Sequence, residues 1–351
     1  VHDNVLNKKG INTTFIREEK LKNVKETTRI YEVEVENNIK QKKPPEIQRN
    51  STRFRYILFP ALTIIIIAIL IWLKMPIKVD SNTEKSIAVR PFWNESADKQ
   101  NEYFVNGVTE DIRNNLAKIS GVKVISRGSM EKYRNTDLTT KEIAKELEVV
   151  YILEGTVQKL DDQVKIHAQL ILAEEDDHAW ERSFVRDLSE VTEVYEIQSQ
   201  IAQSVAEELK VIITPQEKLL IEKIPTQNQQ AYDLYLRGRD AFFRFYLIRT
   251  NDDLVHCIHL FQQSINNDDK FALSYAWLGR AIEYQIGQKI FIDYNEDTII
   301  SLCNKALSLE PNLADGYWIR GRYYRNTGQF QKAIEDFHKA LEINPNNALA
   351  Y

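Results

Sequence analysis

The sequence predicts a multidomain protein that combines α/β and all-α architecture with a single transmembrane helix. Three patterns predict this fold class, and they follow one another along the chain: an uncharged apolar run, a region of alternating strand and helix periods, and repeated pairs of amphipathic helices. A length of 351 residues fits two or three domains, and a composition with 43% hydrophobic and 28% charged residues is typical of globular proteins.

The apolar run covers residues 56–73 and reads YILFPALTIIIIAILIWL, without a charged side chain. As a helix it would be about 27 Å long, which is close to the hydrocarbon thickness of a bilayer. A buried helix of a soluble domain is the alternative, but such apolar runs are shorter and polar residues interrupt them. The pattern favours a single-pass protein of the bacterial inner membrane.

Basic residues around this run predict its orientation. The twenty residues before it hold six Lys and Arg, and the twenty residues after it hold four. Because cytoplasmic flanks carry more positive charge, we expect the N-terminal side in the cytoplasm and the C-terminal side in the periplasm or outside the cell. Residues 37–55, which are basic and contain Pro44-Pro45, are predicted to be a linker.

Charge and cysteine content exclude two classes of function. A net charge of -5 gives no electrostatic footprint for a nucleic acid. Two cysteines, Cys257 and Cys303, do not make a disulfide scaffold, and each is predicted to be a small buried hydrophobe on a helix. The chain begins with Val1 and ends at Tyr351 inside a repeating pattern, so we interpret it as a piece of a longer protein.

The first part of the chain, residues 1–36, is rich in β-prone sequence. Apolar residues alternate with glutamates in Arg29–Glu36, and a second β-prone run lies at Thr13–Ile16. The segment GINTTFIREEKLKNVKETTRIYEV resembles the last hairpin of class III adenylate/guanylate cyclase catalytic domains. The resemblance implies that residues 1–36 are the C-terminal edge of a truncated cyclase-like domain. An unrelated two-stranded edge is the alternative.

The cyclase resemblance implies a catalytic core that this chain does not contain. In that family the metal-binding aspartates, the transition-state arginine and the base-reading residues lie upstream of the hairpin. None of them can be assigned here, so we expect no catalytic, cofactor-binding or metal-binding residue in this chain. The family implies Mg²⁺ for the missing core, and a homodimer in which both subunits contribute to each site.

Residues 85–223 are predicted to form an α/β domain. Ser86–Pro91 and Val122–Ser126 are expected as parallel strands around a helix that ends at Gly121, a glycine just beyond the helix. A second helix begins at Thr139, which Glu142 completes as a capping box. An antiparallel meander is expected to follow, with strands at Tyr151–Lys159, Val164–Leu172 and Ala179–Val185. Two helices are expected after it, one at Val194–Leu209 and one that begins at Thr214.

Four segments of this region resemble the TolB-like (FlgO-related) amino-terminal domain of bacterial signalling proteins. They read IAVRPF, YFVNGVTEDIRNNLAKISGVKVISR, YILEGTVQKLDDQVKIHAQLI and HAWERSF. The resemblance implies an α/β binding or protein-interaction domain without a known reaction.

Catalytic interpretations of the α/β region are weaker than structural ones. Glu174–His178 could hold a cation, but a charged hairpin turn explains it better. Glu154-Gly155 fits close backbone packing within a strand, and neither His167 nor His178 has a partner at a recognised motif spacing. No Walker loop or dinucleotide fingerprint is present in the sequence.

Residues 226–351 carry a 34-residue pattern that resembles the tetratricopeptide repeat, most clearly in residues 314–347. Arg320 departs from the pattern, and the residues that match it are Tyr317, Gly321, Tyr324, Ala333, Phe337, Ala340 and Pro345. Two looser copies precede it, marked by Leu234, Gly238, Cys257, Phe261 and Ser264, and by Tyr275, Gly279, Cys303, Ala306 and Pro311.

Two clusters in the repeats invite a functional interpretation. His256, Cys257 and His259 could bind a metal, but neighbouring residues on a helix point apart, so surface histidines around a core cysteine are favoured. The aromatic group Tyr235, Phe242, Phe243, Phe245 and Tyr246 is expected in the core rather than in a ligand cage. Because repeat solenoids offer a concave surface, a protein or peptide partner is predicted.

The order of these regions predicts a membrane-anchored signalling protein. Its α/β and repeat regions would bind a partner or ligand and regulate a cytoplasmic nucleotide cyclase. The alternatives are a membrane-integrated transcription regulator and a protein-interaction scaffold without cyclase activity. The sequence leaves open whether ATP or GTP is the substrate of the longer protein.

Overall fold

The computed structural model describes residues 11–19, 28–35, 85–160, 163–188, 190–289 and 294–347. They belong to two units, Val1–Lys78 and Val79–Tyr351. The first unit contributes a hairpin of β1 (Ile11–Glu19) and β2 (Thr28–Val35), which pair antiparallel with Ile11 opposite Val35. This hairpin confirms that both β-prone runs of residues 1–36 form strands.

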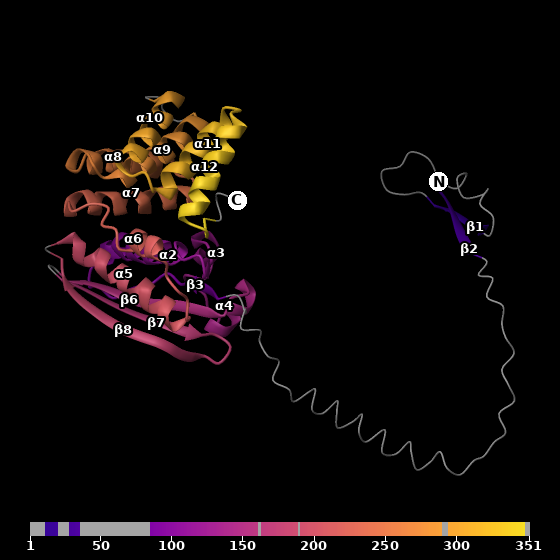
Figure 1. Ribbon diagram of the computed structural model, residues 1–351, viewed down its shortest axis with the longest axis horizontal. Helices are drawn as coiled ribbons and strands as arrows, with labels where there is room; N and C mark the ends of the chain where they lie inside the picture. The colour runs from indigo at the N-terminus through magenta and orange to yellow at the C-terminus, as the bar shows by residue number, and fades with distance from the viewer. Residues whose placement is uncertain are drawn as a thin grey trace, which may run out of the picture. The chain divides into compact units, whose positions relative to one another are not determined.

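The predicted fold class is wrong in its transmembrane helix. None of the helices among the described residues is long and apolar enough to cross a membrane. The apolar run at residues 56–73 and the linker at residues 37–55 lie outside the described residues. The architecture that the structure shows consists of a sheet region and helical repeats (Figure 1).

The sheet of the second unit is mixed. Its strands are β3 (Ser86–Val89), β4 (Trp93–Asn94), β5 (Lys123–Val124), β6 (Tyr151–Leu160), β7 (Gln163–Leu172) and β8 (Asp177–Asp187). Their order is β5-β3-β6-β7-β8, with β4 paired to β6. β3 runs parallel to β5 and β6, whereas β6, β7 and β8 are antiparallel, so the predicted parallel pair and meander are both confirmed.

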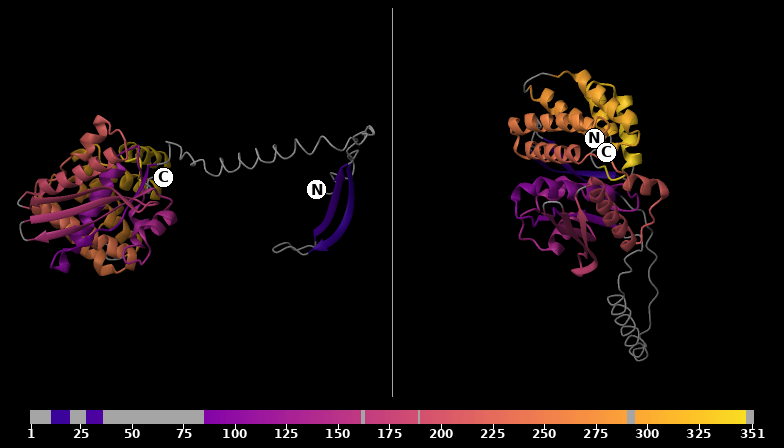
Figure 2. Two further views of the ribbon diagram at one scale, coloured as in Figure 1. Left: turned by 90° about the horizontal axis from the view of Figure 1, so that it is seen from below. Right: turned by 90° about the vertical axis from the view of Figure 1, so that its left-hand side faces the viewer.

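The helices of the α/β region are η2 (Lys99–Asn101), α2 (Glu102–Ala117), α3 (Arg127–Glu131), α4 (Thr140–Leu147), α5 (Val191–Glu208) and α6 (Pro215–Ile221). α2 and α5 cover one face of this sheet (Figures 1 and 2), whereas Ile143 of α4 packs with Ala88 and Ile152 in a second apolar cluster on the other face. α2 and α5 pack against the sheet through Ile112 and Ile201, which are fully buried with Ile166 of β7. Period-3.6 apolar positions on the helices therefore meet period-2 positions on the strands.

The helix boundaries test the predicted capping residues. Thr139 and Glu142 form the expected capping box at α4, and Thr214 with Glu217 forms another at α6. The prediction for Gly121 is wrong: α2 ends at Ala117, and Gly121 is not among the residues with a positive φ angle. A Cβ atom at Gly121 would lie 2.6 Å from Cγ1 of Val211, so tight packing accounts for the glycine.

In the part of the repeats that the structure describes, three helix pairs lie on the helical side of the α/β region (Figure 1). The helices are α7 (Gln229–Ile248), α8 (Asn251–Asn267), α9 (Ala272–Gly287), α10 (Glu296–Leu309), α11 (Ala314–Asn326) and α12 (Phe330–Ile343). In the first pair, a Cβ atom at Gly238 would lie 2.7 Å from Phe261, and in the third pair one at Gly321 would lie 2.7 Å from Phe337. The same glycine and phenylalanine contact therefore sets the spacing of both pairs.

One apolar core runs through the sheet, α2, α5 and the repeats. Within it, α2 packs directly against α7, and Leu236 of α7 would meet a Cβ atom at Gly107 of α2 at 2.7 Å. Because the two regions share a core, the residues at their junction are held in fixed relation to each other.

Candidate functional site

A cavity of about 580 Å³ lies where the α/β region meets the repeats. One wall comes from α2 and α3, and the facing wall comes from α7, α9 and α11, which are the first helices of the three repeats. The segment 343–347 borders it as well. Its size falls within the range of small-molecule and peptide pockets, and its walls combine aromatic and charged side chains.

The segment 343–347 is fastened to the α/β region by Asn346. Its side-chain nitrogen donates to the carbonyl oxygens of Ala117 and Val122, at 3.0 and 2.8 Å. Its side-chain oxygen accepts from the backbone N–H of Val124 at 2.9 Å. The end of the third repeat is therefore bonded to the end of α2 and to β5.

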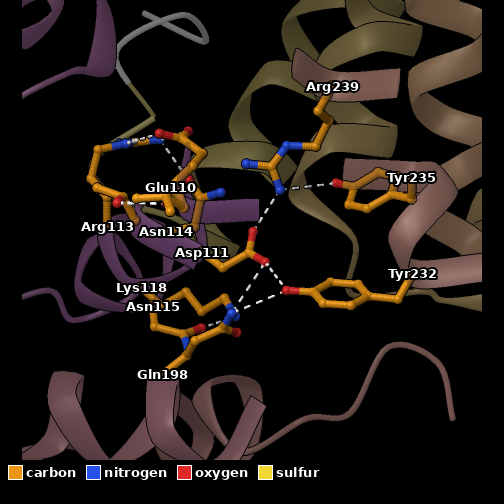
Figure 3. Close-up of polar contacts among 12 residues, drawn as sticks. Glu110, Asp111, Arg113, Asn114, Asn115, Lys118, Gln198, Tyr232, Tyr235 and Arg239 are labelled. Carbon is orange, nitrogen blue, oxygen red and sulfur yellow. Dashed lines mark hydrogen bonds and ion pairs between the residues drawn. The ribbon is translucent and has the colours of Figure 1, made fainter. Parts of the chain in front are cut away.

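Asp111 of α2 is the polar centre of the junction (Figure 3). Its carboxylate forms a 2.5 Å ion pair with Arg239 of α7 and accepts a hydrogen bond from the Tyr232 hydroxyl at 2.9 Å. Gln198 of α5 donates to Tyr232 at 3.1 Å. Burial alone would lower the pKa of Arg239, but its negative neighbours, including Asp111, hold that pKa well above the usual value. Arg239 is therefore charged, and its ion pair with Asp111 holds the guanidinium in place.

Glu110, the residue before Asp111, is also neutralised. Arg113 donates to both of its oxygens, at 2.9 and 2.6 Å, in the two-pronged geometry that guanidinium and carboxylate groups favour. Burial would raise the pKa of Glu110, but Arg113 outweighs burial and lowers the pKa to about 2. Both acidic side chains of this turn of α2 therefore have a cationic partner.

Four charged groups of the cavity wall have no ion-pair partner among the described residues: Arg127, Lys118, Asp315 and the exposed Lys270. Burial lowers the pKa of Arg127 to about 10 and that of Lys118 to about 8. The Lys118 ammonium donates to neutral oxygens of Asn115 and Leu220, at 2.8 and 2.9 Å. Burial raises the pKa of Asp315. These groups are the ones that a ligand could neutralise.

The predicted aromatic cluster is divided between core and cavity. Phe245 is fully buried and belongs to the core, as expected. Phe243 and Tyr246 line the cavity, and Tyr246 is 48% exposed, so the core interpretation is wrong for these two residues. The Arg127 guanidinium lies over the Phe243 ring, 3.6 Å from its centre. This contact links α3 to the repeats across the cavity.

The other sites that the sequence raised do not form a ligand cluster. Across the described ranges, no three His, Cys, Asp or Glu side chains are grouped to hold a metal ion. Glu174 pairs with Lys141 in an exposed contact. Cys257 and Cys303 are free and fully buried.

Gly155 and His167 lie on strands of the α/β region. The structure confirms the prediction for Gly155 and adds neighbours to His167. A Cβ atom at Gly155 would lie 2.1 Å from the His167 carbonyl oxygen, which confirms close backbone packing there. His167 does have neighbours that its sequence spacing did not reveal: Ser183 at 3.1 Å and Glu181 at 3.6 Å. Because all three are cross-strand neighbours on β7 and β8 at the protein surface, they do not make an enclosed nucleophilic site.

Sequence reasoning missed the charged residues of the junction, Asp111, Arg127 and Arg239. One signal was available on α7, where Tyr232, Tyr235 and Arg239 recur at spacings of three and four and so share one face. The polar face of α2 gave no such signal, because a solvated face and a buried polar junction have the same pattern.

Comparison with known proteins supports the repeats and a link to cyclases. A tetratricopeptide repeat family model matches residues 314–347. The chain is 34% identical over 160 residues to the protein named "Putative adenylate cyclase 3" of Rhizobium meliloti (strain 1021). That match covers 46% of this chain and 27% of the relative, so the chain spans about a quarter of the relative's length. Together the matches indicate a signalling or protein-interaction role.

Solved structures with partial similarity fall into two groups. The first tetratricopeptide domain of Spaghetti, bound to an HSP90 peptide, is 20% identical with a TM-score of 0.29, and the match covers 35% of this chain and 88% of that one. TolB from Acinetobacter baumannii is 14% identical with a TM-score of 0.28, over 36% of this chain and 28% of that one. The TolB-like family resemblance stays a prediction.

Proposed function

We propose that this chain is the peptide-binding, regulatory part of a signalling protein related to adenylate cyclases. The observation that carries the proposal is the cavity that α2 and α3 form with the first helix of each repeat. Concave repeat surfaces bind extended peptides through rows of side chains on such helices. The repeat family match and the homology to an adenylate cyclase support the two halves of the proposal.

The junction supports coupling between binding and a distant catalytic core. Arg239 and Tyr232 of α7 bind Asp111 of α2, so the repeat wall of the cavity is bonded to the α/β region. A peptide that shifts α7 changes these contacts, and a change of contacts between two states is what allows a ligand to regulate at a distance. The regulated core would be a homodimeric class III cyclase that uses Mg²⁺.

The test is cyclic nucleotide formation by the complete protein. The rate is measured with ATP and with GTP in the presence of Mg²⁺, for the wild type and for Asp111→Asn. We expect product from one nucleotide and a several-fold change of rate in the variant. Asp269→Asn, an exposed acid outside the cavity wall, is the matched control.

Two results would count against the proposal. Absence of any cyclic nucleotide product would overturn the cyclase part and leave a scaffold or a transcription regulator as the alternative. A product rate that Asp111→Asn leaves unchanged would overturn the coupling through the junction.

A further inference from the structure

We propose that the cavity selects acidic, extended peptides, and that the α/β region supplies this selectivity through Arg127 and Lys118. The inference rests on the proposed peptide-binding function and names the class of its ligand. In this arrangement the repeats provide an aromatic wall, whereas the charges that discriminate between peptides come from the α/β region.

The length of the cavity favours an extended chain over a compact ligand. Tyr232 and Leu247 both line it, and they lie fifteen residues apart on the single helix α7. At about 1.5 Å rise per residue their separation is about 22 Å. An extended peptide advances about 3.3 Å per residue, so six or seven residues would cover this distance.

The charges that remain after internal pairing are mainly positive. Glu110 is neutralised by Arg113 and Asp111 by Arg239, so neither of the two acids that α2 contributes to the cavity wall leaves an unpaired negative charge. Arg127 and Lys118 keep their charge without an ion-pair partner in the described part of the chain. Carboxylates act on these cations only from beyond ion-pair distance, Asp111 and Asp315 on Lys118 and Glu110 on Arg127. Because a buried cation without a direct partner is unfavourable, a ligand carboxylate that pairs with it is stabilised.

The geometry of Arg127 suits a carboxylate. Its guanidinium carbon lies 3.6 Å from the centre of the Phe243 ring, a distance that fits stacking, and no described residue accepts a hydrogen bond from its N–H groups. Stacking leaves those N–H groups free at the edge of the guanidinium plane, where a carboxylate can accept two hydrogen bonds.

A further unpartnered donor lines the same cavity. The Tyr195 hydroxyl is buried, and no described residue hydrogen-bonds to it. Because an unsatisfied buried polar group costs free energy, a peptide carbonyl or carboxylate oxygen that reaches this hydroxyl is favoured. Tyr195 belongs to α5, so it too comes from the α/β region.

Among the described wall residues without an ion-pair partner, only Asp315 of α11 opposes an acidic ligand. Its carboxylate interacts electrostatically with Lys118 and Arg239. A peptide acid must therefore compete with Asp315 for Lys118. Removal of this carboxylate should strengthen the binding of acidic peptides.

The experiment measures binding of three pools of fluorescent seven-residue peptides to the full chain. All pools contain Trp and Phe, with Asp and Glu in the first, Asn and Gln in the second, and Lys and Arg in the third. Fluorescence anisotropy gives the affinities at two salt concentrations. We expect the acidic pool to bind at least tenfold more tightly than the basic pool, and less tightly at high salt, because screening weakens charge attraction.

Variants assign the selectivity to the named residues. Arg127→Met and Lys118→Met should each weaken the acidic pool at least fivefold without weakening the neutral pool, and Asp315→Asn should strengthen the acidic pool. Arg182→Met removes an arginine that lies over Phe184 on β8, outside the cavity, and is the matched control. Circular dichroism confirms that each variant is folded, and the salt dependence of the wild type tests the charge argument should one variant fail to fold.

Other outcomes separate this inference from the proposed function. Equal binding of the acidic and neutral pools, without salt dependence, would overturn the acidic selectivity and leave peptide binding intact. Failure of all three pools to bind would overturn both.

Discussion

The carboxylate of Asp111 on α2 forms a 2.5 Å ion pair with the guanidinium of Arg239 on α7. The pair joins the α/β region to the first repeat, and only 3% of the Arg239 side chain is exposed. Sheet region and repeats are therefore connected by a charged contact as well as by apolar packing.

Asp111→Asn should destabilise the protein by about 3 kcal/mol, because loss of one partner leaves the other charge buried without compensation. Urea unfolding of the wild type and the variant measures the change. Asp233→Asn, which removes the acid from the half-exposed pair with Arg237, should cost about 1 kcal/mol or less. Equal losses in the two variants would show that the Asp111 pair is no stronger than a surface pair.

Glu110 should give the protein an acid-sensitive component of stability. Its pKa falls from 4.5 to about 2 on folding, so the unfolded chain binds the proton more readily. The resulting stability is complete above about pH 4.5, is lost as the pH falls to about 2, and corresponds to about 3 kcal/mol. Urea midpoints between pH 7 and 2 should fall less steeply for Glu110→Gln than for the wild type. The exposed Glu335→Gln should keep the wild-type profile.

Gly321→Ala should destabilise the last repeat by about 1 to 3 kcal/mol, because a Cβ atom there would lie 2.7 Å from the Phe337 ring. Gly287→Ala is the matched control, since no atom lies within 4 Å of a Cβ atom at that position of α9. The control should be neutral or slightly stabilising, because alanine favours helices. Thermal unfolding measures both changes, and a neutral Gly321→Ala would contradict the packing account.

Cys257 and Cys303 should not react with thiol reagents in the native protein. Burial raises the pKa of both thiols, to about 12 for Cys303, so little reactive thiolate is present near pH 8. Mass spectrometry after iodoacetamide treatment should show no modification in buffer and two modified cysteines in urea. Rapid modification in buffer would mean that the repeats open readily.

Local pattern predicted much of the fold. Alternation in Val164–Leu172 and the capping pair at Thr139 each depend on neighbours in sequence, and the structure contains both the strand and the cap. Gly121 was misassigned because a glycine after a helix suits a left-handed cap and a tight contact equally well, and only the position of Val211 decides between them.

The candidate site could not be predicted in this way. It depends on which face of α2 meets α7, and the sequence shows only that α2 has an apolar face and a polar one. Asp111 and Arg239 are 128 residues apart, and no spacing rule connects them. The prediction of a membrane-spanning helix rested on the length and hydropathy of one apolar run. None of the helices in the described ranges is long and apolar enough to cross a membrane.

The attachment of Asn346 to the end of α2 has a mechanical consequence. In a repeat solenoid each repeat contacts only its neighbours, so the curvature follows from small rotations between successive repeats. Here the first of the described repeats is bonded to the α/β region through Arg239 of α7, and the third is bonded to it through Asn346. A change of curvature across these three repeats would have to break one of the two attachments. The α/β region therefore sets the width of the cavity.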